Sequence, residues 1–413
     1  METLTLIEHE SLPIRDKRSP GDRWLAPDQV TALGKVEKMF PVRPFAWGAR
    51  SVKFAQYCGV ISLGNLTLEI LPKVYGKEQE PGACRQTLVR MLQKARLLKT
   101  LRGGTAEVAL QRHSLLEVFI LHFCDLLHAE LTQGMIRHYV TKEENLPLLR
   151  GRLRVEKQLK ENLAHRERLY CQYDELSADN AHNRIIKFVL RLLMKLTTGV
   201  TVRKQLTELL MRFDNIADVV VAPAAVDALH FDRVTTRYEP IFDQCRWFLQ
   251  GLSPDVTSGD KSCLTLLFDM NRLFESYVAS MLRKVAGQRG LKMREQGPRK
   301  FMAVREAPNQ QLFMMKPDMV FIDENDGHVA IADAKWKLLD ETDKKMGISQ
   351  GDLYQIASYA TRYGVNNLAL IYPMHEGLTE PVKFNLLNTT ATVTVLPLDI
   401  QSKEPRYILG FWQ

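Results

Sequence analysis

The sequence has no long apolar run and few cysteines, and both shortages exclude classes of protein. Its longest apolar stretch, residues 115–127, is interrupted by Glu117, His122 and Asp125, so it cannot supply the roughly 20 apolar residues of a transmembrane helix. The first 21 residues contain no apolar core of a secretory signal. The six cysteines form no C-x-x-C pair, which argues against a zinc or redox motif. We therefore expect reduced thiols in a cytoplasmic protein with no membrane partner.

The surplus of positive over negative charge is also small. The 413 residues include 56 Lys and Arg against 48 Asp and Glu, a net charge of +8. Hydrophobic residues make up 45% of the chain, which excludes a disordered protein. Residues 261–413 hold 19 Lys and Arg against 17 Asp and Glu, so they carry only +2 of the surplus. This balance permits a nucleic-acid partner without establishing one.

Hydrophobic patterns predict three consecutive regions. A β-rich domain occupies residues 1–76, a mainly helical region residues 77–258, and a further domain residues 259–413, with Pro, Ser and Gly clustered at the last boundary. In the first region, residues 52–61 and 66–74 are predicted to form a hairpin around a four-residue loop. Alternation of apolar and polar residues predicts that its second strand is half-buried.

Helical periodicity dominates the middle region. The spacing of apolar residues predicts helices over residues 179–197, 202–216 and 240–252, and Asp179 is the predicted cap of the first. Residues 135–178 are basic and polar, and no helix or strand is predicted for them.

The last region is predicted to begin with an amphipathic helix over residues 264–285, with Glu275 at its flank. Residues 311–322 read as a strand bent at Pro317, and residues 328–336 as the strand that returns beside it. A helix and another strand follow, which completes a small α/β core.

This hairpin is predicted to bring two carboxylates and an amine together. Asp333 and Lys335 are two residues apart in a strand and therefore point to the same face. The preceding strand places Asp318 beside Asp333. Burying such charges is costly unless they are paired or bind a metal, so a buried ion pair without catalytic function is the alternative.

The same groups suit metal-dependent phosphodiester hydrolysis. The carboxylates of Asp318 and Asp333 and the backbone carbonyl of Ala334 are predicted to hold Mg²⁺, for which Mn²⁺ can substitute. Such a metal polarises the phosphoryl group and lowers the pKa of a bound water. Lys335 is the predicted catalytic amine, which orients that water or offsets charge in the transition state.

Three further residues are candidates for the same site. Glu275 lies upstream on a helix, where a solvated helix flank is the alternative. Gln355 and Tyr359 are four residues apart on one face of a later helix, where ordinary helix packing is the alternative.

The motif formed by Pro317-Asp318 and Asp333-Ala334-Lys335 resembles that of the PD-(D/E)xK nuclease family. The helical acid and the Q-x-x-x-Y spacing downstream also occur in that family. The resemblance implies a multidomain α+β and α/β protein with a C-terminal restriction-endonuclease-like core, after a β-rich N-terminal segment and a helical middle region.

Two upstream segments resemble the McrC subunit of McrBC-type modification-dependent restriction systems. They are residues 64–73 and residues 173–187, and the second contains Asn183-Arg184-Ile185-Ile186-Lys187. The run Gly151-Arg152-Leu153 also fits that family, and the resemblance covers most of residues 55–375.

This resemblance implies a motor partner. McrC-type subunits dock on a hexameric ring of McrB, an AAA+ GTPase, insert a projection into its channel, stimulate its nucleotide hydrolysis and cut modified double-stranded DNA. The present chain has no G-x-x-x-x-G-K-[ST] loop, so the partner would bind the nucleotide. Candidate contacts with the motor are Arg150, Arg152, Arg154, Asn183 and Arg184. Solvated basic surface and local helix capping are the alternatives for these five.

The function predicted from the sequence is thus a Mg²⁺-dependent endonuclease subunit of an antiphage restriction complex. Two other functions stay open. The chain would be an adaptor that activates the NTPase without cutting, or a motor-independent nuclease of the DNA-repair or phage type.

Overall fold

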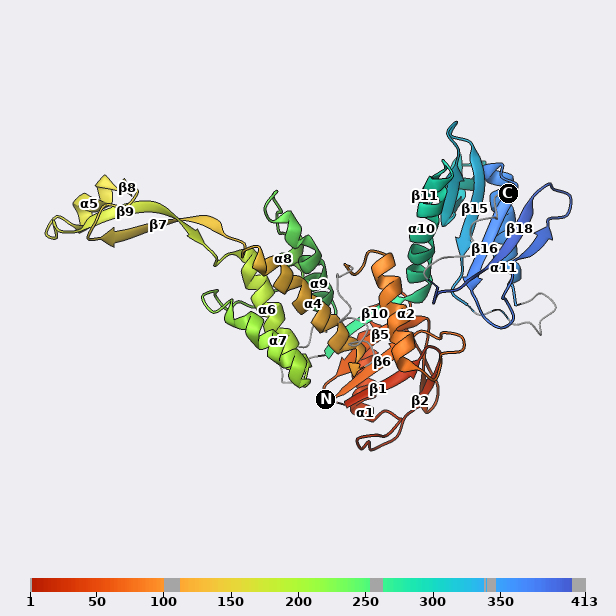
Figure 1. Cartoon of the computed structure of the whole chain (residues 1–413), viewed down its shortest axis with the longest axis horizontal. Coiled ribbons are helices and arrows are strands. Elements are labelled where there is room, and N and C mark those ends of the chain that lie inside the picture. The colour runs from red at the N-terminus through yellow and green to blue at the C-terminus, as the bar shows by residue number, and fades with distance from the viewer. Residues whose placement is uncertain (1, 100–111, 253–262, 338, 340–346, 403–413) are drawn as a thin grey trace. The chain divides into compact units, whose positions relative to one another are not determined.

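The computed structural model describes residues 2–99, 112–252, 263–337, 339 and 347–402. These residues form a mixed structure of helices and several β-sheets, as predicted (Figure 1). They divide into two compact units. Unit 1 is Leu116–Leu266, and unit 2 combines Glu2–Leu115 with Leu267–Gln413. Unit 1 is therefore an insertion into the chain of unit 2. The predicted three-part division stays a prediction, and its boundary at residue 258 lies outside the described residues.

A four-stranded sheet in the order β1-β6-β5-β10 is built on the N-terminal part of unit 2, and its strand β10 runs from the end of unit 1 into unit 2. In this sheet β1 runs parallel to β6, and β5 antiparallel to it. Its strands are β1 (Glu2–Ile7), β5 (Tyr57–Leu63), β6 (Leu66–Leu71) and β10 (Cys263–Asp269). The predicted hairpin is present, but its loop has two residues rather than four, because Leu63 pairs with Leu66. Gly64 supplies the left-handed turn conformation, with φ 66°.

Smaller elements surround this sheet. They are a three-stranded sheet of β2 (Ser11–Pro13), β4 (Ser51–Phe54) and β3 (Phe45–Trp47), and the helices α1 (Pro27–Glu37) and α2 (Pro81–Lys94). Helix α2 begins at a proline, which suits the first turn because its missing N–H has no partner there. It packs on β6 through an apolar stripe that includes Leu88 and Leu92.

Strand β6 is buried on both faces, so the predicted half-buried strand is wrong. Its polar face is covered as well, and Glu69 is fully buried there. Arg85 of α2 donates to both oxygens of Glu69, at 2.6 and 2.7 Å. Thr5 Oγ1 and the backbone N–H of Leu115 also donate to this carboxylate, at 2.7 and 2.6 Å. A complete set of donors makes burial of the charge tolerable.

The C-terminal part of unit 2 is built on a six-stranded sheet in the order β11-β14-β15-β16-β18-β17. Its central pairs, β15 with β16 and β16 with β18, are parallel, and the outer pairs are antiparallel. The strands are β11 (Lys292–Glu295), β14 (Met319–Ile322), β15 (His328–Ala334), β16 (Asn367–Pro373), β17 (Val382–Asn385) and β18 (Thr392–Leu398). A separate hairpin is formed by β12 (Lys300–Arg305) and β13 (Gln310–Met315).

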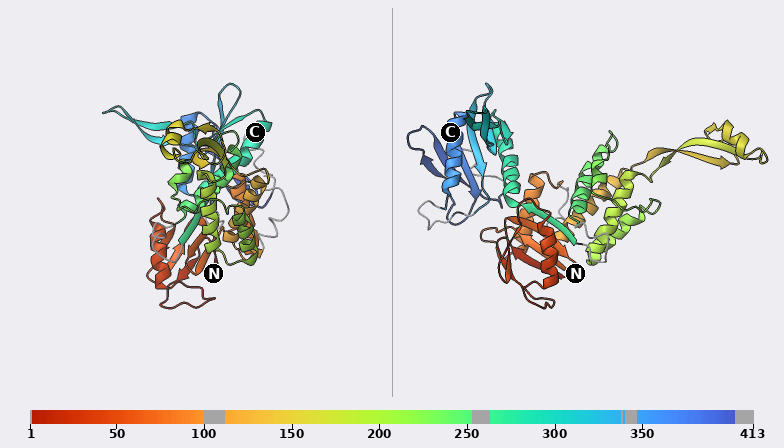
Figure 2. Two further views of the ribbon diagram at one scale, coloured as in Figure 1. Left: turned by 90° about the vertical axis from the view of Figure 1, so that its left-hand side faces the viewer. Right: turned by 180° about the vertical axis from the view of Figure 1, so that it is seen from behind.

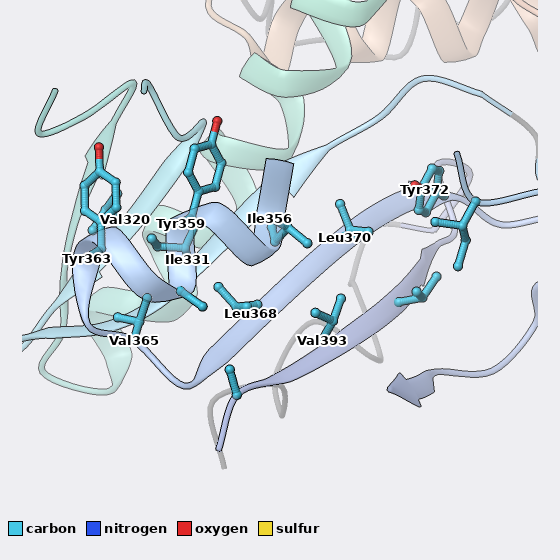
Figure 3. Packing of buried hydrophobic residues seen from close by; sticks show 14 of the residues in the cluster. Val320, Ile331, Ile356, Tyr359, Tyr363, Val365, Leu368, Leu370, Tyr372 and Val393 are labelled. Atoms are coloured by element: carbon cyan, nitrogen blue, oxygen red, sulfur yellow. The ribbon is translucent and has the colours of Figure 1, made fainter. Parts of the chain in front are cut away.

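Two helices cover this sheet, α10 (Met270–Gln288) and α11 (Gln350–Tyr363). One face of α11 packs Ile356 and Tyr359 against Ile331 and Leu370 of the sheet (Figure 3). Because side chains of a strand alternate, Trp336 belongs to the other side, where its ring lies 5.3 Å from that of Phe274 in α10.

Two predicted elements of this part need correction. The predicted helix over residues 264–285 begins only at Met270, because residues up to Asp269 form β10 and the Asp269 side chain caps the helix. The predicted bent strand over residues 311–322 is two strands in two different sheets. The proline between them has no N–H to continue a ladder, so the chain leaves one sheet and enters the next.

Unit 1 consists of helices and a long arm. The helices are α4 (Leu115–Thr132), α6 (Ala181–Leu196), α7 (Val200–Met211), α8 (Ala224–Asp227), the 3₁₀ turn η1 (Thr236–Tyr238) and α9 (Glu239–Gln250). The arm is formed by β7 (His138–Leu146), β8 (Arg152–Leu153), α5 (Val155–Glu161) and β9 (Leu169–Ser177). It extends away from α4 and α6 (Figure 1). Its strands were missed in the sequence because both faces are largely solvated and show no apolar alternation.

The cap of α6 also differs from the prediction. Asn180, not Asp179, accepts the hydrogen bond from the backbone N–H of Asn183, at 3.1 Å. Asp179 instead pairs with Arg184. Within the residues that the structure describes, no helix is long and apolar enough to span a bilayer.

Removal of the buried carboxylate in β6 tests this part of the fold. Glu69→Ala should lower the free energy of unfolding by about 3–5 kcal/mol, because Arg85 is left without its partner inside the protein. The matched control is Glu80→Ala, which removes an exposed ion pair with Lys77 and should cost less than about 1 kcal/mol. Urea denaturation of both variants measures the difference, and equal losses would contradict a structural role for Glu69.

Candidate active site

The antiparallel pair β14–β15 places the two predicted acids together. Met319 pairs with Ala332, so Asp318 and Asp333 lie at the same end of the two strands. The backbone N–H of Ala334 donates to Oδ2 of Asp318 at 2.9 Å. Because Ile331 and Val320 belong to the core beneath α11, the alternation of the strands directs both acids to the α11 face.

Asp333 is almost completely buried and its oxygens lack hydrogen-bond donors. Its side chain retains only 2% of its exposure. Nζ of Lys335 lies 2.6 Å from Oδ2, which is an ion pair, yet neither oxygen accepts a hydrogen bond of good geometry. A buried carboxylate with a free oxygen is unusual, since such groups are normally satisfied, and it indicates a ligand position.

Lys335 connects the acids to α11. Its Nζ donates to Oε1 of Gln355 at 3.1 Å, and Nε2 of Gln355 donates to the hydroxyl of Tyr359 at 2.9 Å. Tyr359 is anchored in the apolar cluster, and Figure 3 shows its ring extending from α11 on the same side as that of Tyr363. The structure thus brings together the lysine, the glutamine and the tyrosine that the sequence predicted.

The protonation of the three charged groups follows from their crowding. Burial raises the pKa of Asp318, and the neighbouring charge of Asp333 raises it further. Burial also raises the pKa of Asp333, against the attraction of Lys335. For Lys335 burial is the largest single influence and opposes the charge, but Asp333, Asp318 and Asp352 together outweigh it and the pKa is raised. The lysine is therefore charged at neutral pH, and each of the two acids takes up a proton more readily than an isolated aspartate unless another cation joins them.

These features fit a hard divalent cation. Mg²⁺ takes oxygen ligands, keeps several waters and uses only one or two protein carboxylates. Asp318, with one oxygen fixed by the Ala334 N–H, and Asp333, with an unpartnered oxygen, match that requirement. Among the described residues no cluster of three or more His, Cys, Asp or Glu side chains offers a metal site of protein ligands alone. The pair would therefore hold a cation together with a backbone carbonyl and water.

Glu275 lies near the acids without joining them. Its negative charge contributes to raising the pKa of both Asp318 and Asp333. Nε2 of Gln296 donates to its Oε1 at 2.9 Å. Its place on α10 agrees with the predicted helix acid at the margin of the site.

A second polar layer was not predicted. Asp352 of α11 forms an ion pair with Lys337 and accepts a hydrogen bond from the hydroxyl of Tyr372 at 3.3 Å. Its charge raises the pKa of Asp333. Asp352 lies one helical turn before Gln355, and this spacing is the signal that could have revealed it.

The other residue missed from the sequence is Glu8, which follows β1. The indole Nε1 of Trp336, next to Lys335, donates to Oε2 of Glu8 at 2.9 Å. Oε1 has no hydrogen-bond donor, although Nε2 of His9 lies 3.4 Å away. Burial raises the pKa of Glu8 to about 7. No local pattern in the sequence indicates this contact, because its partners are more than 300 residues apart.

The five predicted motor contacts fall into two groups. On the arm, the guanidinium of Arg150 stacks 3.9 Å from the ring of Tyr173, and Arg154 lies 3.4 Å from Glu143. Arg152 is exposed, and its side chain forms no ion pair, hydrogen bond or ring contact with the described residues.

The other group, at the start of α6, has internal partners. The Asn183 amide donates to the carbonyls of Ile136 and Ala178, both at 2.7 Å. Arg184 donates to both oxygens of Asp179, at 2.7 and 2.8 Å. These bonds join the helix to the base of the arm.

Comparisons with known proteins identify a matching family and similar solved structures. The family model described as McrBC 5-methylcytosine restriction system component matches residues 52–373. No curated protein matches the sequence. A chain in the refined half-complex of a tetradecameric assembly of Thermococcus gammatolerans McrB AAA+ hexamers with bound McrC is similar over 99% of this chain and 98% of its own, with TM-score 0.79 and 22% identity. A chain in the cryo-EM structure of the Thermococcus gammatolerans McrBC complex is similar over 68% of this chain and 88% of its own, with TM-score 0.56 and 26% identity.

The buried Glu8 predicts a pH-dependent stability. Its pKa rises from 4.5 to about 7 on folding, so the folded protein binds the extra proton and loses stability as the pH rises through this interval. The full loss corresponds to about 3 kcal/mol. Glu8→Gln keeps the acceptor for Trp336 and removes the charge, so the variant should melt above the wild type at pH 8 and near it at pH 4.5. If the melting temperatures of the wild type and of Glu8→Gln differed by the same amount at pH 4.5 and pH 8, Glu8 would not be neutral in the folded protein.

Proposed function

The chain belongs to the family of McrBC 5-methylcytosine restriction system components, and on this basis we propose that it is the DNA-cleaving subunit of a modification-dependent restriction complex. Its C-terminal part would be a PD-(D/E)xK endonuclease core. Five cysteines are buried with free thiols, which favours the reducing cytoplasm as its location.

One observation carries this proposal. Asp318 and Asp333 meet beside Lys335 at the end of β14 and β15, and Asp333 is buried with an unpartnered oxygen. A purely structural ion pair would use its oxygens in hydrogen bonds, because an unmet buried acceptor costs about 1–3 kcal/mol. The arrangement is explained when a Mg²⁺ ion, with Mn²⁺ as a substitute, is held by both acids and the Ala334 carbonyl.

The chain's own residues then have separate tasks. A bound Mg²⁺ supplies electrostatic stabilisation of the phosphoryl group and a water of lowered pKa. Lys335, charged and held by Gln355, orients a water or stabilises negative charge that develops on the phosphate. Tyr359 fixes Gln355, and Asp352 adds negative charge behind the acids. Glu275 is placed to position solvent at the margin of the site.

The buried, incompletely hydrogen-bonded Asp333 also helps to decide between a nuclease and the two alternative functions. An adaptor that does not cut would gain stability by losing Asp333, so its retention favours a nuclease over a decayed scaffold. A motor-independent nuclease would leave unit 1 and its arm without a task. The reconstituted complex, with modified duplex DNA, Mg²⁺ and nucleotide, separates these possibilities.

The central test is selective loss of cleavage. Asp333→Ala should abolish cleavage of modified DNA by the reconstituted complex, and Lys335→Ala should slow it at least about 100-fold, because each removes charge at the reacting phosphate. Both variants should stimulate the partner NTPase as the wild type does.

A binding measurement supports the interpretation of that test. Mg²⁺ should raise the melting temperature of the wild type but not of Asp333→Ala, since a ligand that binds only the folded state stabilises it. The control is Glu324→Ala, an exposed acid in the turn after β14, which should cut DNA and respond to Mg²⁺ normally. Cleavage by Asp333→Ala would contradict the proposed site.

For the partner, we propose an AAA+ GTPase hexamer of the McrB type that binds the nucleotide. The likeness to a structure of McrB AAA+ hexamers with bound McrC supports this choice. Within unit 1, the arm of β7, β8, α5 and β9 is the element we assign to the channel of the ring. Leu148 and Leu149, at 77% and 60% exposure, give its tip an apolar surface that fits a protein contact.

Arg152 is the arm residue best placed to stimulate the motor, because Arg150 and Arg154 already have internal partners. Arg152→Ala should reduce stimulated NTP hydrolysis by at least about fivefold, the effect of about 1 kcal/mol of coupling. Arg137→Ala, an exposed arginine just before β7, is the matched control. Normal stimulation by Arg152→Ala, or equal loss in both variants, would contradict this assignment.

A further inference from the structure

The hairpin of β12 and β13, whose second strand ends shortly before Asp318, exposes large apolar side chains. Phe313 is 73% exposed and Met302 59%, and Val304 and Met314 are exposed as well. The two strands pair only with each other, and the teal hairpin extends away from the six-stranded sheet in the left view of Figure 2. Exposed apolar side chains gathered on one element mark an interaction surface.

Phe313 also has an unfavourable backbone conformation. Its φ is 58°, in the left-handed region that bulky residues rarely adopt. The flanking pairs, Phe301 with Met314 and Ala303 with Leu312, keep the register on both sides. The ring is not buried in return for this conformation, so packing does not explain it, and an exposed aromatic residue in a strained conformation points to a functional contact.

Positive charge is concentrated in the same segment. Residues 292–316 contain six Lys and Arg against two Glu, a net +4, although residues 261–413 together carry only +2. Arg299 and Arg305 are exposed and form no ion pair with any acid in the described part of the chain. Of the two acids, Glu295 is already paired with Arg283. The segment is therefore an electropositive patch with unpartnered cations.

The hairpin is rooted beside the candidate site. At the base of the hairpin Lys300 pairs with Met315, and Met315 is three residues before Asp318 in the sequence. The backbone N–H of Gln296 donates to the carbonyl of Asp318 at 2.8 Å. On the helix side, Nε of Arg362 donates to the carbonyl of Phe301 at 2.8 Å. The ribbon is thus held at its base by both the catalytic strand and α11.

We propose that the β12–β13 hairpin is a DNA-binding ribbon, with Phe313 and Met302 in a groove of the duplex and Arg299 and Arg305 on its phosphates. This inference rests on the proposed cleavage of DNA. Two paired strands of six residues are about 20 Å long, and a groove of about 12 Å admits such a ribbon. A second copy of the chain would bury the apolar side chains but leave the cations without partners. Duplex DNA offers base edges to the apolar side chains and phosphates to the cations.

Binding of a fluorescein-labelled 40-bp duplex with 5-methylcytosine, measured by anisotropy on the full-length chain, tests the ribbon. The double variant Phe313→Ser, Met302→Ser should bind about tenfold more weakly, because it loses apolar contacts with base edges and thymine methyl groups in the groove. Arg299→Gln with Arg305→Gln should reduce the slope of log K against log salt by about 2. The matched controls lie at the opposite edge of the sheet: Leu387→Ser, where the side chain is 90% exposed, and Lys383→Gln. Both should bind DNA as the wild type does.

Three results would overturn the inference. They are wild-type binding by the hairpin variants, no measurable binding by the wild-type chain, and a change in sedimentation coefficient of the serine variant with unaltered DNA affinity, which would indicate a contact between copies. Cleavage assays keep this question apart from the proposed function. Cleavage that depends on Asp333 but not on the hairpin leaves the nuclease assignment intact, and hairpin-dependent binding without such cleavage contradicts only the nuclease.

Discussion

Repulsion between the carboxylates of Asp318 and Asp333 is the constraint on which the C-terminal part of the chain depends. Asp333 is buried and Asp318 partly so; the register of β14 and β15 brings them together, and Lys335 offsets their charge. The fold tolerates this repulsion because the other face of the sheet is apolar and closely packed. The small side chains of Ala332 and Ala334 on that face let α10 approach, so the strain of the site is supported by ordinary hydrophobic packing.

The acids also depend on residues far from them in the sequence. Trp336 joins three parts of unit 2, because its indole contacts Phe274 of α10 and donates to Glu8 beyond β1. The N-terminal sheet is therefore part of the support of the site and not an independent module.

Local patterns predicted which candidate site residues lie together, but not their surroundings. The alternation in β15 and the four-residue spacing of Gln355 and Tyr359 predicted which side chains share a face, because both depend only on regular strand and helix geometry. The strands of the arm were missed, since a ribbon solvated on both faces has no apolar period. Glu69 was misjudged because its cover, α2, comes from tertiary contacts that alternation cannot report. The Glu8 contact has no local signature at all.

The insertion of unit 1 has a consequence during synthesis of the protein. The sheet order β1-β6-β5-β10 requires β10, which spans the end of unit 1 and is translated after helix α9. At about 5–20 residues per second, the ribosome needs roughly 10–30 s to add the intervening residues. During that interval β5 has an unpaired edge in the nascent chain, and such an edge is open to pairing with other chains. Rapid folding of unit 1, or binding of a chaperone to that edge, would then decide how much of the protein reaches its native state.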